Sequence, residues 1–109
     1  MKTLKFAEKL VPSVLNGTKT ATWRLFDDKN LSVGDELDLV HATTREHFAY
    51  AVITSVKELA IQDITDADRV GHESMGDVDE ICAIYEGYYH QHISPESRMK
   101  IVRFELVKS

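Results

Sequence analysis

Residues 16–24 read NGTKTATWR, and this stretch sets the point where a helix ends and a strand begins. Asn16-Gly17 is a strong helix stop, because glycine takes the left-handed conformation after a helix at little cost. The threonines and the tryptophan that follow predict a strand over 20–25. On a regular strand Trp23 would face one way, and the polar face would carry Thr20, Thr22 and Arg24. The stretch therefore predicts a strand entry with a polar face and Lys19 at its start.

The remaining pattern alternates between extended and helical segments. Apolar spacing predicts a helix over 7–16, with Pro12 in its first turn. Residues 33–36, VGDE, predict a turn, and residues 26–32 are expected to form a charged loop. Period-two alternation and β-branched residues predict extended segments over 2–6, 37–39, 48–56 and 99–107.

A capping box marks a second helix. Asp77 is placed to cap it, and Glu80 follows three residues later. The apolar stripe behind this start comprises Val78, Ile81, Cys82, Tyr85 and Tyr89. Because strands arrive in runs without regular βαβ alternation, the predicted class is α+β. We expect a small, curved, mostly antiparallel sheet or β-barrel with flanking helices, and a ligand at its mouth or in a groove beside a helix.

Composition narrows the class of protein. The chain has 109 residues, which predicts a single domain over 1–109 that buries a core without disulfides or metals. Its N-terminus lacks the apolar middle of a signal peptide, and Cys82 has no partner cysteine, so we expect a cytoplasmic protein. The net charge of −5 (13 basic, 18 acidic residues) argues against an indiscriminate nucleic-acid binder.

The basic residues are concentrated at the start of the chain. Residues 1–24 contain Lys2, Lys5, Lys9, Lys19 and Arg24 against Glu8 alone. A basic patch on an acidic body suits a partner with few phosphates or a small polar ligand. The plainer interpretation is that Lys2, Lys5 and Lys9 are solvated surface charges.

These features together resemble a family. The features are a helix ending at Gly17, the motif K-T-x-T-x-R over 19–24, the V-G-D turn, an acidic Glu73 before a helix and the closing strand I-V-R-F-E-L over 101–106. In their order along the chain they are similar to a stand-alone ASCH domain of the PUA-like superfamily. The order and spacing match over nearly the whole chain. The resemblance implies a β-barrel with helices packed around it and a groove for RNA or a nucleotide.

The resemblance also implies an activity. Some small bacterial ASCH proteins are amidohydrolases that remove the acetyl group from N4-acetylcytidine, with a lysine, a threonine and a glutamate as the catalytic set. The motif places the first two at Lys19 and Thr22, and the residue before the later helix is Glu73. Family members often show E-G-F there, whereas this chain has Glu73-Ser74-Met75. Thr20, Arg24, Trp23 and Tyr88 are the candidate substrate-binding residues.

The chemistry leaves the proton-transfer roles open. Lys19 would serve as a base for Thr22 only if burial or a positive neighbour such as Arg24 lowered its pKa. With Lys19 charged, it would stabilise an oxyanion, and Glu73 would act as the base through water. Positions three apart on a regular strand face opposite ways, so Lys19 must belong to the turn after Gly17 or reach around with its stem.

Each of these residues also has a purely structural interpretation. Thr22 is a good strand former, and Lys19 could be a surface charge. Arg24 could pair with Asp27 or Asp28. Glu73 could favour the helix start through its dipole.

Other residue patterns are weaker. The histidines are His41, His47, His72, His90 and His92, and none shows a third ligand at zinc-like spacing, so we expect surface or packing histidines and neither metal nor cofactor. Cys82 is expected to be a buried helix residue. Of Tyr88 and Tyr89, one ring is expected to pack and the other to line the groove.

Three functions fit this sequence. The leading hypothesis is hydrolysis of the N4-acyl amide of N4-acetylcytidine, with RNA or a modified nucleoside as the partner. The second is a non-catalytic RNA-binding module with the same groove. The third is a ribonuclease, in which Lys19 would steady the phosphorane charge.

Overall fold

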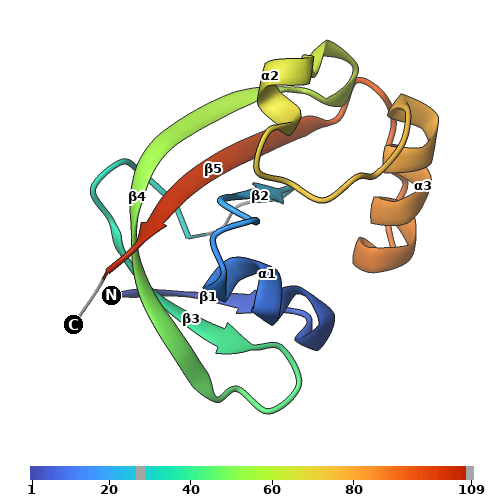
Figure 1. The fold of residues 1–109 in the computed structure, drawn as a ribbon. Helices are drawn as coiled ribbons and strands as arrows, with labels where there is room; N and C mark the ends of the chain where they lie inside the picture. Colours follow the sequence, from blue (N-terminus) through green and yellow to red (C-terminus); the bar gives the residue numbers. More distant parts are fainter. Residues whose placement is uncertain (27–28, 108–109) are drawn as a thin grey trace.

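The structure is a computed structural model that describes residues 1–26 and 29–107, and in it one curved sheet of five strands organises the molecule. The strands are β1 (Lys2–Phe6), β2 (Ala21–Arg24), β3 (Glu36–His41), β4 (His47–Ala60) and β5 (Arg98–Leu106). Their order is β1-β3-β4-β5-β2. Figure 1 shows how the sheet curls into a half-barrel. The predicted α+β class is confirmed, with a half-barrel in place of a closed barrel.

The sheet is mixed but mostly antiparallel, as expected. In the described part of the chain, β1 and β3 form the one parallel pair, and β4 bridges the two halves by pairing with both β3 and β5. A register shift between Ile53 and Ser55 marks a bulge in β4. Bulges bend a strand and increase its twist, so the bulge helps the sheet to curl. The predicted strand over 48–56 was too short, because the second half of β4 continues along β5 as far as Ala60.

The helices are short except for one. They are the 3-10 turns η1 (Glu8–Leu10) and η2 (Ile61–Asp63) and the helices α1 (Val11–Leu15), α2 (Asp66–Arg69) and α3 (Val78–Tyr89). The predicted helix over 7–16 is therefore two pieces, and Pro12 lies in the first turn of α1. The helix stop at Asn16-Gly17 is confirmed, with a φ of 83° at Gly17. Neither η2 nor α2 was predicted from the sequence.

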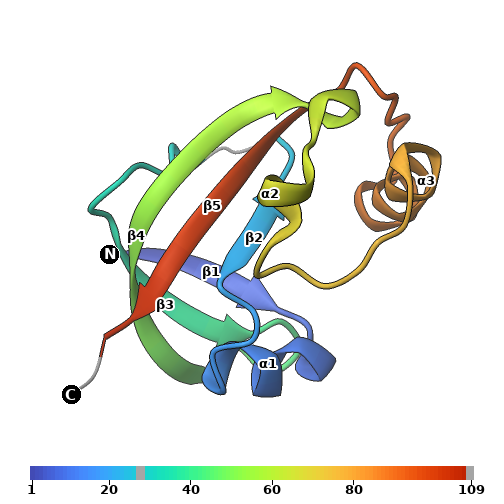
Figure 2. The ribbon, with the colours of Figure 1, turned by 45° about the horizontal axis from the view of Figure 1, so that its top comes forward.

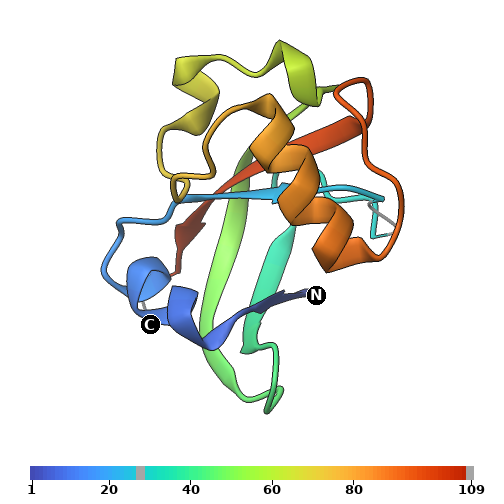
Figure 3. The same cartoon turned by 90° about the vertical axis from the view of Figure 1, so that its right-hand side faces the viewer.

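α3 confirms its predicted start and its buried face. Asp77 and Glu80 form the capping box, and the helix buries Ile81, Cys82 and Tyr85. Cys82 is 6% exposed, as expected for a packing residue. Figure 3 shows α3 in front of β2. Among the described residues, no helix has the length and apolar character needed to cross a membrane.

Two apolar clusters hold these parts together. The barrel core fills the curved sheet beneath α1 and comprises Leu4, Phe6, Val11, Val14, Leu31, Leu37, Leu39, Ala51, Ile53, Val102 and Phe104. The helix core joins the β2–β5 end of the sheet to α3 and comprises Trp23, Leu25, Leu59, Ile61, Ile81, Cys82, Tyr85, Ile93, Met99 and Ile101. The short edge strand β2 contributes Trp23 to the helix core, so this edge of the sheet faces α3 (Figure 2).

Candidate active site

A pocket of about 300 Å³ opens where the edge strands β1 and β2 approach each other beside α3. All but one of the site residues expected from the sequence line it: Lys19, Thr22, Trp23, Arg24, Glu73 and Tyr88. Thr20 is the exception. It lies in a different depression, together with Leu15 and Leu106.

Lys19 is buried at the entry to β2 and pairs with Glu73. Lys19 precedes β2, so Lys19 and Thr22 need not face opposite ways, as two positions three apart on a regular strand would. Its side chain is 4% exposed, which excludes the interpretation as a surface charge. Nζ donates to the carbonyl of Ala21 at 2.9 Å and to Oε1 of Glu73 at 2.5 Å. An ammonium has three N–H donors, so one remains for a ligand.

The 71–73 segment brings Glu73 to Lys19 across 54 residues of sequence. The carbonyl of Gly71 accepts hydrogen bonds from the backbone N–H groups of Thr20 and Ala21, at 2.8 and 3.1 Å. Gly71 has a φ of 80°, and a Cβ there would collide with Oγ1 of Thr20. The backbone of Thr20 therefore holds the 71–73 segment in place, and position 71 must be glycine because it lies so close to the Thr20 side chain.

Burial and neighbouring groups shift the pKa of both members of the Lys19–Glu73 pair. Burial lowers the pKa of Lys19 and the Glu73 carboxylate partly offsets this, while the Arg24 charge lowers it further. Burial raises the pKa of Glu73, but the hydrogen bond from Lys19 and its other polar contacts outweigh that effect, so the pKa of Glu73 falls below its usual value. Glu73 is thus ionised at neutral pH, and Asp77 rather than Glu73 caps α3.

Arg24 orients Thr22 and links the two edge strands. Its Nε donates to Oγ1 of Thr22 at 2.9 Å, and its Nη2 donates to the carbonyl of Lys5 on β1 at 3.1 Å. The guanidinium also lies 5.3 Å from the centre of the Phe6 ring. Within the described residues no hydrogen bond joins Thr22 to Lys19 or Glu73, so its hydroxyl is set by Arg24. The suggested pairing of Arg24 with Asp27 or Asp28 lies outside the described residues.

His72 lies in the pocket, although the sequence predicted it only as a surface or packing histidine. Its ring stacks on Trp23 with centroids 3.8 Å apart and an angle of 10° between the planes. Burial and the nearby Lys19 charge lower the pKa of His72 to about 4, so the ring is neutral at neutral pH. Trp23 is 3% exposed and therefore belongs to the helix core while it also walls the pocket. The adjacency of His72 to Glu73 was the only signal in the sequence.

The remaining walls differ in character. α3 supplies a mainly apolar wall, in which Tyr85 is buried and Tyr88 is 64% exposed. The hydroxyl of Tyr89 accepts a hydrogen bond from the Leu25 N–H at 3.3 Å, which packs that ring. On the other side, β1 and η1 supply Lys5 and Lys9. The pocket thus offers an aromatic side, a cationic side and polar groups at its base, which suits a flat ring with polar substituents.

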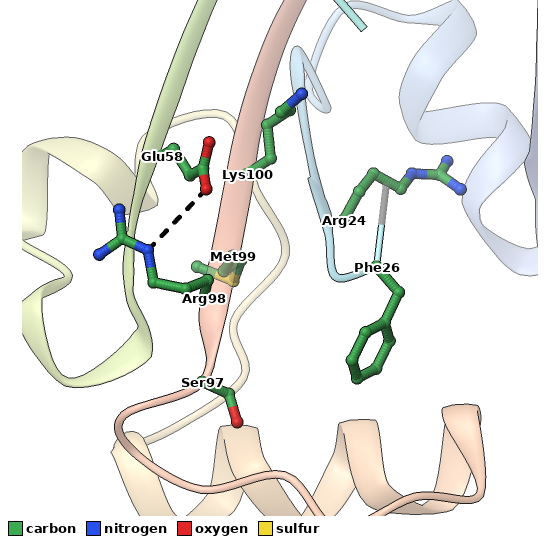
Figure 4. Close-up of a pocket in the computed structure, with 7 residues that line it drawn as sticks. All are labelled: Arg24, Phe26, Glu58, Ser97, Arg98, Met99 and Lys100. Carbon is green, nitrogen blue, oxygen red and sulfur yellow. Dashed lines mark ion pairs between the residues drawn. The ribbon is translucent and has the colours of Figure 1, made fainter. Parts of the chain in front are cut away.

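Another depression, of about 420 Å³, lies on the other side of Arg24 (Figure 4). Its lining includes Glu58 and Arg98, which form an ion pair at 3.9 Å with both side chains well exposed. In Figure 4 Arg24 points away from that pair. Exposed ion pairs of this length contribute little, and none of the described residues that line the depression has a buried polar side chain, so the 300 Å³ pocket is the better candidate.

Comparison with known proteins supports the fold. No protein-family model matches the sequence, and no curated protein is significantly similar to it. A protein of Enterococcus faecalis V583 described by the family model DUF984 matches 91% of this chain and 70% of its own, at 17% identity and a TM-score of 0.74.

Two ASCH structures match as well. The ASCH domain from Lactobacillus crispatus JV V101 covers 87% of this chain and 68% of its own, at 14% identity and a TM-score of 0.64. ASCH from Zymomonas mobilis covers 94% and 65%, at 8% identity and a TM-score of 0.64. This chain thus spans about two thirds of those structures. Its fold is that of the ASCH domains.

Proposed function

We propose that this protein is a member of the ASCH family that binds a modified nucleoside and hydrolyses the N4-acyl amide of N4-acetylcytidine. The observation that carries the proposal is the buried Lys19–Glu73 pair in one pocket with Thr22. These are the residue types of the amidohydrolase set, and they meet from positions far apart in the chain. The ASCH-like fold supports the same assignment.

The charge states favour one distribution of roles. Glu73 is ionised and 38% exposed, so it is the group that accepts a proton, from water or from Thr22. Lys19 keeps one N–H donor for the carbonyl oxygen, where negative charge develops. Arg24 donates to Oγ1 of Thr22, which favours the deprotonated oxygen and makes Thr22 the nucleophile or the group that orients water.

Hydrolysis balances with these groups. The attacking oxygen adds to the acyl carbon, and Glu73 takes its proton. The bond between the acyl carbon and N4 then breaks, and the proton passes to N4. Acetate and cytidine are the products, and when Thr22 is the nucleophile a water releases the acyl group in a second step.

The test is a chromatographic assay with N4-acetylcytidine. Wild type should release cytidine, and Thr22→Ala should lose at least about 100-fold in kcat/KM with its unfolding midpoint nearly unchanged. Thr22→Ser is the matched control and should keep part of the activity, because it retains the hydroxyl. Full activity of a folded Thr22→Ala protein would remove Thr22 from the mechanism.

RNA binding at the same pocket is the second candidate, and the cationic wall favours it. Lys5 and Lys9 have no acidic partner within residues 1–26 and 29–107, although the chain is acidic overall. Exposed Tyr88 adds a face on which a base could stack. Binding to single-stranded RNA that weakens with salt, without cytidine release, would favour this function. Products ending in a 2',3'-cyclic phosphate would instead indicate a ribonuclease.

A further inference from the structure

We propose that His72 determines ligand specificity by accepting, at Nε2, a hydrogen bond from an N–H group of the ligand. With the ligand of the proposed function, on which this identification rests, that group is the N4–H of the acetylated amide. The inference concerns a residue outside the Lys19, Thr22 and Glu73 set. It follows from how the imidazole ring is held.

One ring nitrogen has a fixed role. Nδ1 of His72 lies 2.9 Å from the main-chain oxygen of Glu73 and 3.3 Å from its Oε1. A carbonyl oxygen and an ionised carboxylate only accept hydrogen bonds. Nδ1 must therefore carry the proton, and in a neutral ring Nε2 is left with a lone pair.

The charges around the ring keep it neutral. Lys19 and Arg24 are the cations that act on it, and Glu73 is the opposing anion. Burial and the Lys19 charge outweigh Glu73, and the pKa of about 4 leaves His72 uncharged at neutral pH. Nε2 is therefore an acceptor under ordinary conditions.

Nε2 is accessible from the pocket. In the part of the chain that the structure describes, no group donates to it. The indole Nε1 of Trp23 is the only buried side-chain polar atom without a partner among those residues, so Nε2 is not sealed inside the protein. Because the side chain is 4% exposed and lines the pocket, the opening is toward the pocket.

The acceptor is also fixed in direction. The stack on Trp23 holds one face of the ring, and the Nδ1 hydrogen bond holds one edge. A rigid acceptor discriminates well, because a ligand that brings no donor leaves a desolvated lone pair unsatisfied. Lys19 is a donor in the same pocket, so the two side chains together offer complementary partners for the oxygen and the N–H of an amide.

The experiment measures binding by calorimetry in a Thr22→Ala background, which prevents turnover. The probes are N4-acetylcytidine and N4-acetyl-N4-methylcytidine, which lacks the N–H. His72→Phe keeps an aromatic ring against Trp23 and removes the acceptor, and His72→Gln returns an acceptor close to the position of Nε2.

With His72 present, N4-acetylcytidine should bind about 10- to 100-fold more tightly than the methylated compound. His72→Phe should weaken binding of N4-acetylcytidine by a similar factor and leave the methylated compound nearly unaffected, and His72→Gln should restore part of the difference. If both ligands weaken equally in His72→Phe, His72 is only a packing residue. If the preference persists in His72→Phe, the methyl group clashes elsewhere, and the assignment is also wrong.

Failure of the proposed function would look different. Absence of binding of either probe by a folded protein overturns the proposed ligand and with it the identification of N4–H. The acceptor itself is checked without ligand, by the nitrogen chemical shifts of the His72 ring at neutral pH. The chemical shifts should show that Nδ1 is protonated and Nε2 is unprotonated. The opposite tautomer would overturn the inference whatever the ligand.

Discussion

Two lysine–carboxylate pairs in this molecule are buried in opposite senses. Between β4 and α2, the Lys57 side chain is 52% exposed and its partner Asp68 is 9% exposed. At the pocket, the Lys19 side chain is 4% exposed and its partner Glu73 is 38% exposed. The same two charges are thus arranged with the anion inside in one region and the cation inside in the other.

The difference indicates that the Lys57–Asp68 pair stabilises local structure, whereas the Lys19–Glu73 pair is suited to chemistry. Besides Lys57, the Asp68 carboxylate accepts from the backbone N–H and the hydroxyl of Thr65, so it is saturated and closes the capping box of α2. Among residues 1–26 and 29–107, Lys19 Nζ has two hydrogen-bond partners, which leaves a third N–H donor next to a cavity. A buried cation with an unused donor beside a half-exposed base is suited to stabilising developing negative charge.

The largest expected effect comes from removing the lysine charge of the pocket pair, compared with removing that of the Lys57–Asp68 pair. Lys19→Met should lower kcat/KM for N4-acetylcytidine by about 1000-fold, because the oxyanion loses its charged donor. Lys57→Met is the matched control and should change kcat/KM by less than about 2-fold, since its side chain is 52% exposed and does not line the pocket. Steady-state kinetics on both variants makes the measurement. Equal losses in the two would show that the pocket pair has no special function.

An intermediate effect tests the structural pair. Asp68→Ala should lower the free energy of unfolding by about 2 kcal/mol, because the cap of α2 and buried hydrogen bonds are lost. Lys57→Met should lower it by less than about 1 kcal/mol, as an exposed partner contributes little. Urea denaturation compares the two. A larger loss in Lys57→Met would mean that the ion pair, and not the cap, stabilises this region.

The smallest effect concerns pH. The unfolded chain takes up a proton on His72 below its ordinary pKa of 6.5, whereas the folded chain resists until about 4. Lowering the pH through this window therefore destabilises the fold, by about 1 kcal/mol between about pH 7.5 and pH 5.5. Stability curves at the two pH values measure it, and His72→Phe should lose this part of the dependence. An unchanged dependence in that variant would mean that other groups bind the protons.

Much of the fold was predictable because its signals are local. Asn16-Gly17 ends a helix and Asp77 with Glu80 starts one by short-range hydrogen bonding and backbone conformation, which need no distant partner. The end of β4 and the small helix α2 were missed for two different reasons. The second half of β4 exists because the distant strand β5 pairs with it. α2 has a local capping box, Thr65 with Asp68, but its four residues are too few to show a helical apolar repeat.

The sequence by itself determined the residue types of the candidate site and the class of the fold. The K-T-x-T-x-R motif and a later Glu73 stood out because of their order along the chain. The tertiary structure decided what those residues do to one another. It buried Lys19 against Glu73, placed Arg24 on Thr22, and turned Thr20 from the pocket to fasten the 71–73 segment.

His72 shows most clearly why the structure was needed. A histidine next to a glutamate has no distinctive pattern in a sequence, since its tautomer and charge depend on groups that are close only after folding. Stacking on Trp23, burial and the Lys19 charge come from segments about 50 residues apart and act only over a few ångströms. Electrostatic character is therefore a property of the folded neighbourhood, whereas helix stops and strand patterns are properties of neighbours along the chain.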